Sequence, residues 1–175
     1  MRQRVIIKWG VSSFFAWGIF GLNLAINWED DPDIEPICGV PSPPQQLSLG
    51  PLRRSMLAPF LVRSAVLEQQ IQAMRNVWCE AAAPVLLALN ADFENPPDAN
   101  GVCLIGRPSV GVVVFETALL TESAVNRARQ LPTVVAASDW NRRVMQAHGL
   151  HHVHTVLQGI DPTLFHPAPG LFNAL

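Results

Sequence analysis

The stretch AASDWNRRVMQAHGLHHVHTVLQGIDPTLFHP, residues 136–167, indicates the fold class of the chain. Ser138 follows a short apolar run and lies where a helix is expected to begin, with its hydroxyl available to the first free N–H groups. Trp140, Val144 and Ala147 recur at helical spacing, and we predict that this face of the helix packs inward.

The same stretch then predicts the end of the helix and a second strand. Gly149 supplies the left-handed residue that commonly ends a helix. Residues 152–157 follow as a short strand, with Val153, Thr155 and Leu157 expected on one face. A strand, a crossover helix and a second strand in so short a space make a βαβ unit with parallel strands. We therefore predict an α/β fold, a Rossmann-like domain of three layers around a mostly parallel sheet.

Composition agrees with a single globular domain. The 175 residues are 49% hydrophobic and 15% charged, which favours a well-buried core over disorder. A net charge of −2 and the absence of any Lys/Arg run give no footprint for nucleic acid. The three cysteines are widely spaced and odd in number, which favours reduced thiols in a cytoplasmic protein: Cys38, Cys79 and Cys103.

The N-terminal region allows two interpretations. In the first, Arg4 to Lys8 forms a strand, a turn follows through Gly10 to Ser13, and a helix comes next. The predicted buried stripe of that helix is Trp17, Phe20, Gly21, Leu24 and Trp28. In the second, the apolar residues 9–28 behind three basic residues form a membrane anchor. Interruption by Lys8 and by two asparagines favours the strand and helix.

The glycines after the first strand also have two interpretations. A glycine-containing loop that opens a helix at the carboxyl end of a parallel strand presents backbone N–H groups to an anion such as phosphate. The residues concerned are Gly10, Ser12, Ser13 and Gly18. Alternatively, Gly18 and Gly21 allow the helix to pack closely on the sheet.

The middle of the chain carries fewer signals. Residues 29–51 are acidic and then proline-rich, which predicts a loop with a short strand at Ile37–Cys38. A helix is predicted to begin near Pro59. Its expected inner face is Phe60, Ser64, Leu67, Ile71 and Met74, with Glu68, Gln69, Gln72 and Arg75 toward water. Residues 84–89 suggest another strand, and residues 92–101 a surface loop.

The apolar run in residues 107–117 is typical of a strand buried on both faces. Thr121 is expected to cap a following helix that extends through Gln130. Glu116, Ser138 and Gln158 then follow three successive predicted strands and should converge on one edge of the sheet as a candidate ligand site. Each also has a structural interpretation, as an ion-pair partner, a helix cap and a loop residue respectively.

Metal binding is not predicted. His152 and His154 project from one face of a predicted strand, but no acidic or Cys partner lies at suitable spacing. We expect solvent-facing or backbone-bonded imidazoles instead. Arg142 and Arg143 lie early in their helix, where they either recruit an anionic ligand or a membrane surface, or simply form a solvated face.

Several of these residues resemble a known family. SDWNRRVMQAHGL followed by VLQGIDPTLFHPAP is similar to the end of the N-terminal domain of retaining GT-B glycosyltransferases of family 4. The matching residues are Ser138, Trp140, Asn141, Gly149, Gly159, Ile160, Asp161, Phe165 and Pro167. Upstream, VGVVVFET resembles the family's strand ending in Glu-Thr, here Glu116 and Thr117. KWGVSSFFAWGIFGLNLA resembles its first strand and glycine loop. A departure is that many members place a His where this chain has Phe115, Glu116 and Thr117.

The resemblance implies one half of a GT-B fold. Residues 1–167 would be the acceptor-side domain and residues 168–175 the start of an interdomain linker, with the C-terminal donor-binding domain absent from this sequence. Such enzymes move a sugar from a nucleotide-sugar donor to a glycan, lipid or protein acceptor without a metal or other cofactor. The implied substrate-binding residues are Gly10, Ser12, Ser13, Gly18, Glu116, Thr117, Ser138, Asn141 and Gln158, and no catalytic residue is assigned. We expect little turnover from the chain alone, and peripheral membrane contact is a further expectation.

An alternative function belongs to another class. A non-catalytic Rossmann-like module that binds a ligand or a partner protein would use the same fold. The face that would normally meet a second domain would then be an apolar patch available for association.

Overall fold

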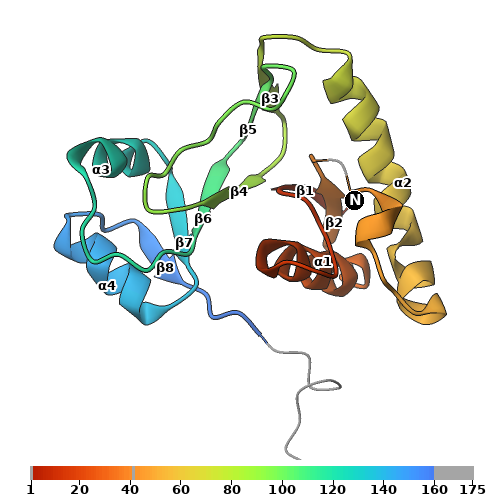
Figure 1. Cartoon of the computed structure of the whole chain (residues 1–175), viewed down its shortest axis with the longest axis horizontal. Coiled ribbons are helices and arrows are strands. Elements are labelled where there is room, and N and C mark those ends of the chain that lie inside the picture. The colour runs from red at the N-terminus through yellow and green to blue at the C-terminus, as the bar shows by residue number, and fades with distance from the viewer. Residues whose placement is uncertain (1, 41, 160–175) are drawn as a thin grey trace, which may run out of the picture.

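The computed structural model describes residues 2–40 and 42–159, and within them six parallel strands form the central sheet (Figure 1). The order of strands in the sheet is β2 (Ile34–Cys38), β1 (Gln3–Lys8), β4 (Val85–Leu89), β6 (Ser109–Val113), β7 (Thr133–Ala136) and β8 (Val153–Thr155). Every neighbouring pair is parallel. The predicted α/β class with a Rossmann-like three-layer arrangement is confirmed.

Helices cover both faces of this sheet. α1 (Ala16–Glu29) packs on the face that carries Ile7, where Trp9 and Val112 complete a buried cluster. α2 (Pro51–Gln72), α3 (Glu122–Arg129) and α4 (Asp139–Ala147) contribute to the core on the opposite face, which carries Ile6. Figure 1 shows α3 and α4 at one end of the molecule and α1 and α2 at the other. A short 3₁₀ turn, η1 (Pro44–Gln46), precedes α2.

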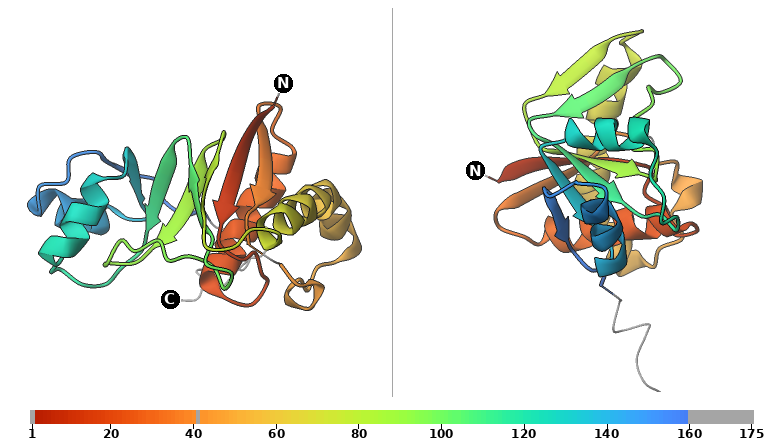
Figure 2. Two further views of the ribbon diagram at one scale, coloured as in Figure 1. Left: turned by 90° about the horizontal axis from the view of Figure 1, so that it is seen from above. Right: turned by 90° about the vertical axis from the view of Figure 1, so that its left-hand side faces the viewer.

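Two strands outside the main sheet form a parallel ribbon, β3 (Trp78–Ala81) and β5 (Cys103–Gly106). Only residues 82–84 separate β3 from β4, and only Arg107 and Pro108 separate β5 from β6. The backbone therefore bends at both places where it leaves the ribbon for the main sheet. Gly106 is required at this bend because a Cβ there would lie 2.5 Å from the backbone nitrogen of Val85. The right-hand view of Figure 2 shows the ribbon above the sheet.

The structure corrects three predicted boundaries. β2 spans five residues rather than two, and it accommodates Pro36 because it is the edge strand, where a missing N–H breaks no second ladder. α2 begins at Pro51 rather than near Pro59, which lies inside the helix. The predicted strand at 107–117 contracts to β6, since the Arg107–Pro108 bend lies before it and pairing ends at Val113.

The inward face of α4 also differs from the prediction. Ser138 caps this helix and Gly149 has a φ of +78°, both as predicted. However, Asn141 and Met145 are the buried residues, whereas Trp140 is 41% exposed and Ala147 is exposed. The helix is turned about one residue from the predicted face because the Asn141 amide, rather than the indole, occupies the buried position.

Other predicted features are confirmed with small changes. β8 ends at Thr155, so Leu157 lies beyond the strand and is 70% exposed. Thr121 caps α3 by accepting a hydrogen bond from the Ala124 N–H at 3.2 Å. The inner face of α2 is as predicted, with Phe60, Ser64 and Ile71 buried, although Glu68 is half-buried. In residues 2–40 and 42–159, no helix is long and apolar enough to cross a membrane.

Candidate functional site at the carboxyl edge of the sheet

The sheet has a topological switch point between β1 and β4. From β1 the chain moves to β2 on one side, and the strands after β4 extend the sheet on the other side. In open parallel sheets, ligands bind beyond the carboxyl ends of the strands at such a point. The segments that leave β1 and β6 at this edge contain most of the residues predicted for the site.

The loop after β1 uses its backbone N–H groups within the chain. The Ser12 N–H donates to the Gly18 carbonyl at 3.1 Å, and the Ser13 N–H donates to the Gln46 carbonyl at 2.8 Å. The Phe14 N–H donates to the Ser12 hydroxyl at 3.1 Å, and Ser12 is fully buried. An anion bound by this loop would therefore contact the amides at the start of α1, or the loop would have to rearrange.

Close packing accounts for the two helical glycines. A Cβ on Gly18 would lie 2.5 Å from the Ser12 Cβ, and one on Gly21 would lie 2.6 Å from Trp9 Nε1. Trp9 in turn donates its indole N–H to the Trp17 carbonyl at 2.9 Å. These two glycines therefore let α1 pack closely on the loop after β1, rather than directly on the sheet as the alternative interpretation predicted.

Ser138 and Asn141 join the start of α4 to the segment after β6. The Ser138 hydroxyl accepts from the Asn141 N–H at 3.1 Å and donates to Asn141 Oδ1 at 3.0 Å. Asn141 is only 3% exposed, and its Nδ2 donates to the Phe115 carbonyl at 2.7 Å. Both side chains are thus engaged in positioning the chain around Phe115, and the buried Asn141 amide is not available to a ligand.

Glu116 and Thr117 follow directly and are exposed. The Thr117 hydroxyl accepts from the Leu119 N–H at 3.2 Å, which shapes the turn toward α3. The link between Asn141 and Phe115 fixes the residue immediately before Glu116. Glu116 and Thr117 therefore follow a residue that Asn141 ties to the Ser138 cap at the carboxyl edge.

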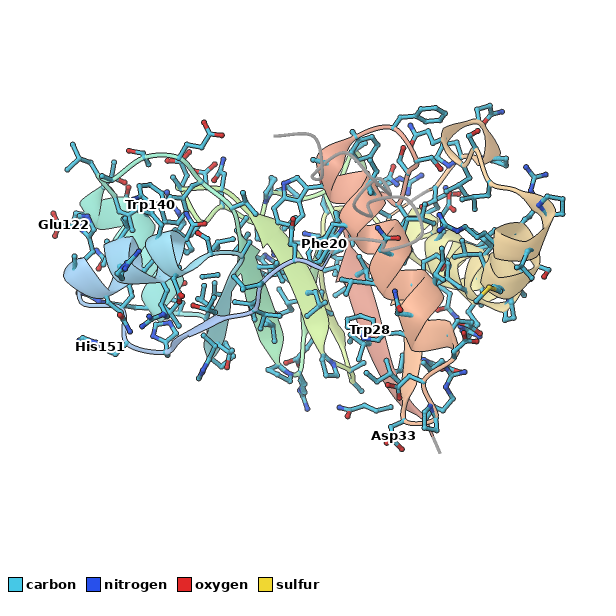
Figure 3. All side chains as sticks on the ribbon, turned by 90° about the horizontal axis from the view of Figure 1, so that it is seen from below. Phe20, Trp28, Asp33, Glu122, Trp140 and His151 are labelled. Atoms are coloured by element: carbon cyan, nitrogen blue, oxygen red, sulfur yellow. The ribbon has the colours of Figure 1, made fainter. Side chains whose placement is uncertain are left out.

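Gln158 lies elsewhere. With Gly159 it borders a cavity of about 670 Å³ along α1, whose other lining residues include Phe20, Asn23 and Arg53. In Figure 3 the chain after β8 runs across the sheet toward Phe20 on α1 and away from Trp140 on α4. The predicted convergence of Glu116, Ser138 and Gln158 is therefore wrong for Gln158. After β8 the chain continues toward α1 and does not turn back above the end of the strand. Ile160, Asp161, Phe165 and Pro167 lie outside the described residues.

Sequence reasoning missed Lys8 as a site residue. It ends β1 at the switch point and donates to the Asn95 side-chain oxygen and, at 3.3 Å, to the Pro96 carbonyl. Burial lowers the pKa of its ammonium, while Cys103 and Asp98 act in the opposite direction. The sequence signal that could have predicted it is a lysine at the end of the first apolar strand, directly before the first crossover.

Exposed apolar side chains accumulate along the carboxyl edge. They come from the loop after β1, the segment after β6 and the first turn of α4: Phe14, Phe15, Val114, Leu119 and Trp140, which are 41% to 79% exposed. Trp140 also packs against Phe115, with ring centroids 5.9 Å apart. These five side chains come from three separate segments and are called the edge patch below; each offers apolar surface to a partner.

The remaining polar candidates either have structural partners or face solvent. His152 Nε2 donates to the Ala128 carbonyl at 3.0 Å, and His154 is exposed, as expected for backbone-bonded and solvent-facing imidazoles. Arg142 donates to Asp139 at 3.2 Å and to the Thr155 hydroxyl at 3.0 Å. Within the described ranges, no group of three or more His, Cys, Asp or Glu could hold a metal ion. The cysteines are free thiols, and burial raises the pKa of Cys38.

Comparisons with protein-family models, curated protein sequences and solved structures found no match to this chain.

Proposed function

We propose that this chain is the acceptor-side half of a glycosyltransferase that moves a sugar from a nucleotide-sugar donor to a glycan, lipid or protein acceptor. The proposal is carried by the arrangement around Asn141. The Ser-x-Trp-Asn pattern through which the sequence resembles the GT-B family holds the exposed Glu116 and Thr117 at the carboxyl edge.

Chemistry at such a site needs a stabilised oxocarbenium-like centre and a departing diphosphate. Glu116 supplies an exposed carboxyl group that can accept hydrogen bonds from acceptor hydroxyls. The start of α1 and the Lys8 ammonium lie at the switch point, where they would stabilise the negative charge of the donor diphosphate. Three free thiols are consistent with a reducing, cytoplasmic setting.

The edge patch fits a two-domain enzyme because a donor-binding domain would cover it. An isolated half would leave these apolar groups exposed and would lack the basic groups that bind a nucleotide. We therefore expect this chain alone to bind nucleotide sugars weakly and to show little turnover.

The test is calorimetric titration of the chain with a panel of nucleotide sugars, alone and mixed with any α/β domain encoded downstream. Donor binding and sugar transfer only in the mixture would support the proposal. A Glu116→Gln variant should then lower transfer while leaving association with the second domain unchanged. Ordinary turnover by the chain alone, or no donor binding in either sample, would contradict the proposal.

The edge patch also favours a second candidate, a non-catalytic module that binds a partner protein. Under this alternative, replacing Leu119 by Asp would abolish partner association, and no sample would transfer sugar. Leu119 is 79% exposed, so the substitution leaves the core intact.

A further inference from the structure

A groove of about 580 Å³ lies between α2 and the β3–β5 ribbon, on the sheet face that carries Ile6. Ile6 and Ile37, from β1 and β2, form its floor and are 3% and 4% exposed. The walls are aliphatic, with Val62, Val66, Leu67 and Ile71 from α2 and Ala81 and Leu104 from the ribbon. This volume falls within the range of about 300–1,000 Å³ that is typical of small-molecule sites.

The rim of the groove exposes apolar surface that a ligand would remove from water. Val62 and Val66, on the α2 side of the groove, are 66% and 53% exposed. The bends at residues 82–84 and 107–108 separate the ribbon from the main sheet, and the space between the ribbon and the helix lies over β1. The groove is therefore a gap in the layer that covers this face of the sheet.

The lining favours a hydrocarbon chain over a peptide. A peptide placed in the groove would bring backbone N–H and C=O groups that need hydrogen-bond partners, and most of the lining side chains are apolar and offer none. A hydrocarbon chain has no such requirement. Gln70 is exposed and leaves a polar contact at the rim for a small headgroup.

The charges at one end of the groove favour an uncharged ligand. Arg63 donates to both carboxylate oxygens of Glu29, and Arg4 donates to Glu35 at 3.1 Å. Both guanidinium groups of the lining are thus already paired with carboxylates. An anionic headgroup would have to compete with these partners.

We infer that this groove binds a single uncharged hydrocarbon chain, such as the tail of a long-chain alcohol or isoprenoid. The site lies on α2 and the ribbon, away from the loop after β1 and from Glu116, so it does not depend on the proposed function.

The first experiment measures fluorescence of N-phenyl-1-naphthylamine, an uncharged apolar probe, and its displacement by straight-chain alcohols of 6 to 12 carbons. Each added methylene should tighten binding about fourfold until the groove is filled, after which affinity should level off. The absence of probe binding, or affinity that keeps rising with chain length without a plateau, would overturn the inference.

Two matched variants on α2 locate the site. Val66→Asp places a carboxylate on the groove wall and should weaken probe binding at least tenfold. Leu52→Asp makes the same change on the same helix at a residue that is 75% exposed and outside the groove, and it should leave binding within twofold. Circular dichroism checks that both fold. Equal effects of the two variants would overturn the assignment.

Further arms test other occupants and other sites. Ile19→Asp alters the α1 cavity, and loss of binding in that variant but not in Val66→Asp would move the site there. Sedimentation that shows a dimer dissociated by Val66→Asp would identify the occupant as a second copy of the chain and contradict the inference. Dodecanoate should bind no tighter than dodecanol. If dodecanoate bound tenfold more tightly than dodecanol, and Arg4→Gln removed this preference, the inference of an uncharged ligand would be overturned.

Discussion

Replacing Asn141 by Ala tests the link between α4 and the segment after β6. The substitution removes the donor that satisfies the Phe115 carbonyl at 2.7 Å, in a position only 3% exposed. An unpaired buried carbonyl costs about 1–3 kcal/mol, and the higher helix propensity of Ala offsets about 0.5 kcal/mol. We expect the free energy of unfolding to fall by about 2 kcal/mol, and the melting temperature to fall by about 4–8 °C for a chain of this size.

The measurement is urea unfolding followed by circular dichroism, with Arg143→Ala as the control. Arg143 is exposed on the same helix, so its replacement should change stability by less than about 0.5 kcal/mol. A loss in Asn141→Ala no larger than that in Arg143→Ala would refute the reasoning, because the amide would then hold nothing in place.

Asn141→Asp separates the hydrogen bond from the packing. The Asp side chain keeps the shape of Asn, but when ionised it presents no donor to the Phe115 carbonyl and is desolvated, so its folded pKa should rise above the unfolded value of about 4. A raised folded pKa makes the variant most stable at low pH, and this stability is lost as pH rises through the folded pKa. The deficit relative to the unmodified chain should therefore widen from pH 4 to pH 7. A deficit independent of pH would contradict this account.

Three further predictions concern other parts of the fold. Gly18→Ala would place a Cβ 2.5 Å from a buried serine side chain and should destabilise the chain by about 1–3 kcal/mol, which thermal unfolding measures. Glu29→Ala leaves the largely buried Arg63 without its bidentate partner and should lower the free energy of unfolding by about 3 kcal/mol, as measured by urea titration. A loss below about 1 kcal/mol, which is typical of an exposed ion pair, would show that solvent screens this pair. The pKa of Asp139 is lowered, chiefly by the Thr155 hydroxyl, so its stabilisation is full above the unfolded pKa of about 4 and is lost as pH falls through the folded value. Asp139→Asn should therefore destabilise at pH 6 and have a smaller effect at pH 2.5, as measured by urea unfolding at both pH values.

The sequence predicted the parts of the fold that short-range patterns control. Ser138, Thr121 and Gly149 occupy cap positions whose chemistry depends only on adjacent residues, and each has its predicted role. The parallel sheet follows from the short strand–helix–strand spacing around them. Glu116 and Ser138 follow β6 and β7, which are neighbours in the sheet as the sequence pattern predicted.

Features that depend on distant contacts were missed. Pro59 suggested a helix start, but α2 continues through it because Leu57 and Phe60 on either side are fully buried against α1 and the β2 region. Trp140 was assigned to the core by its helical spacing with Val144 and Ala147, whereas the buried position goes to Asn141, whose partner lies 26 residues away. The path of Gln158 toward α1 has no local sequence signal at all.

The central position of β1 has a consequence for the order of folding. The β4–β6, β6–β7 and β7–β8 pairs join residues that are roughly 20 to 25 positions apart in the sequence. No pairing made by β1 is that local, and its contact with β4 joins residues roughly 80 positions apart. Closing the longer loop is entropically less favourable, so the strands from β4 to β8 should acquire protected amides before Ile6 and Lys8 do. Pulsed hydrogen exchange during refolding would then show two kinetic groups of amides divided between β1 and β4, the position where the candidate site is completed.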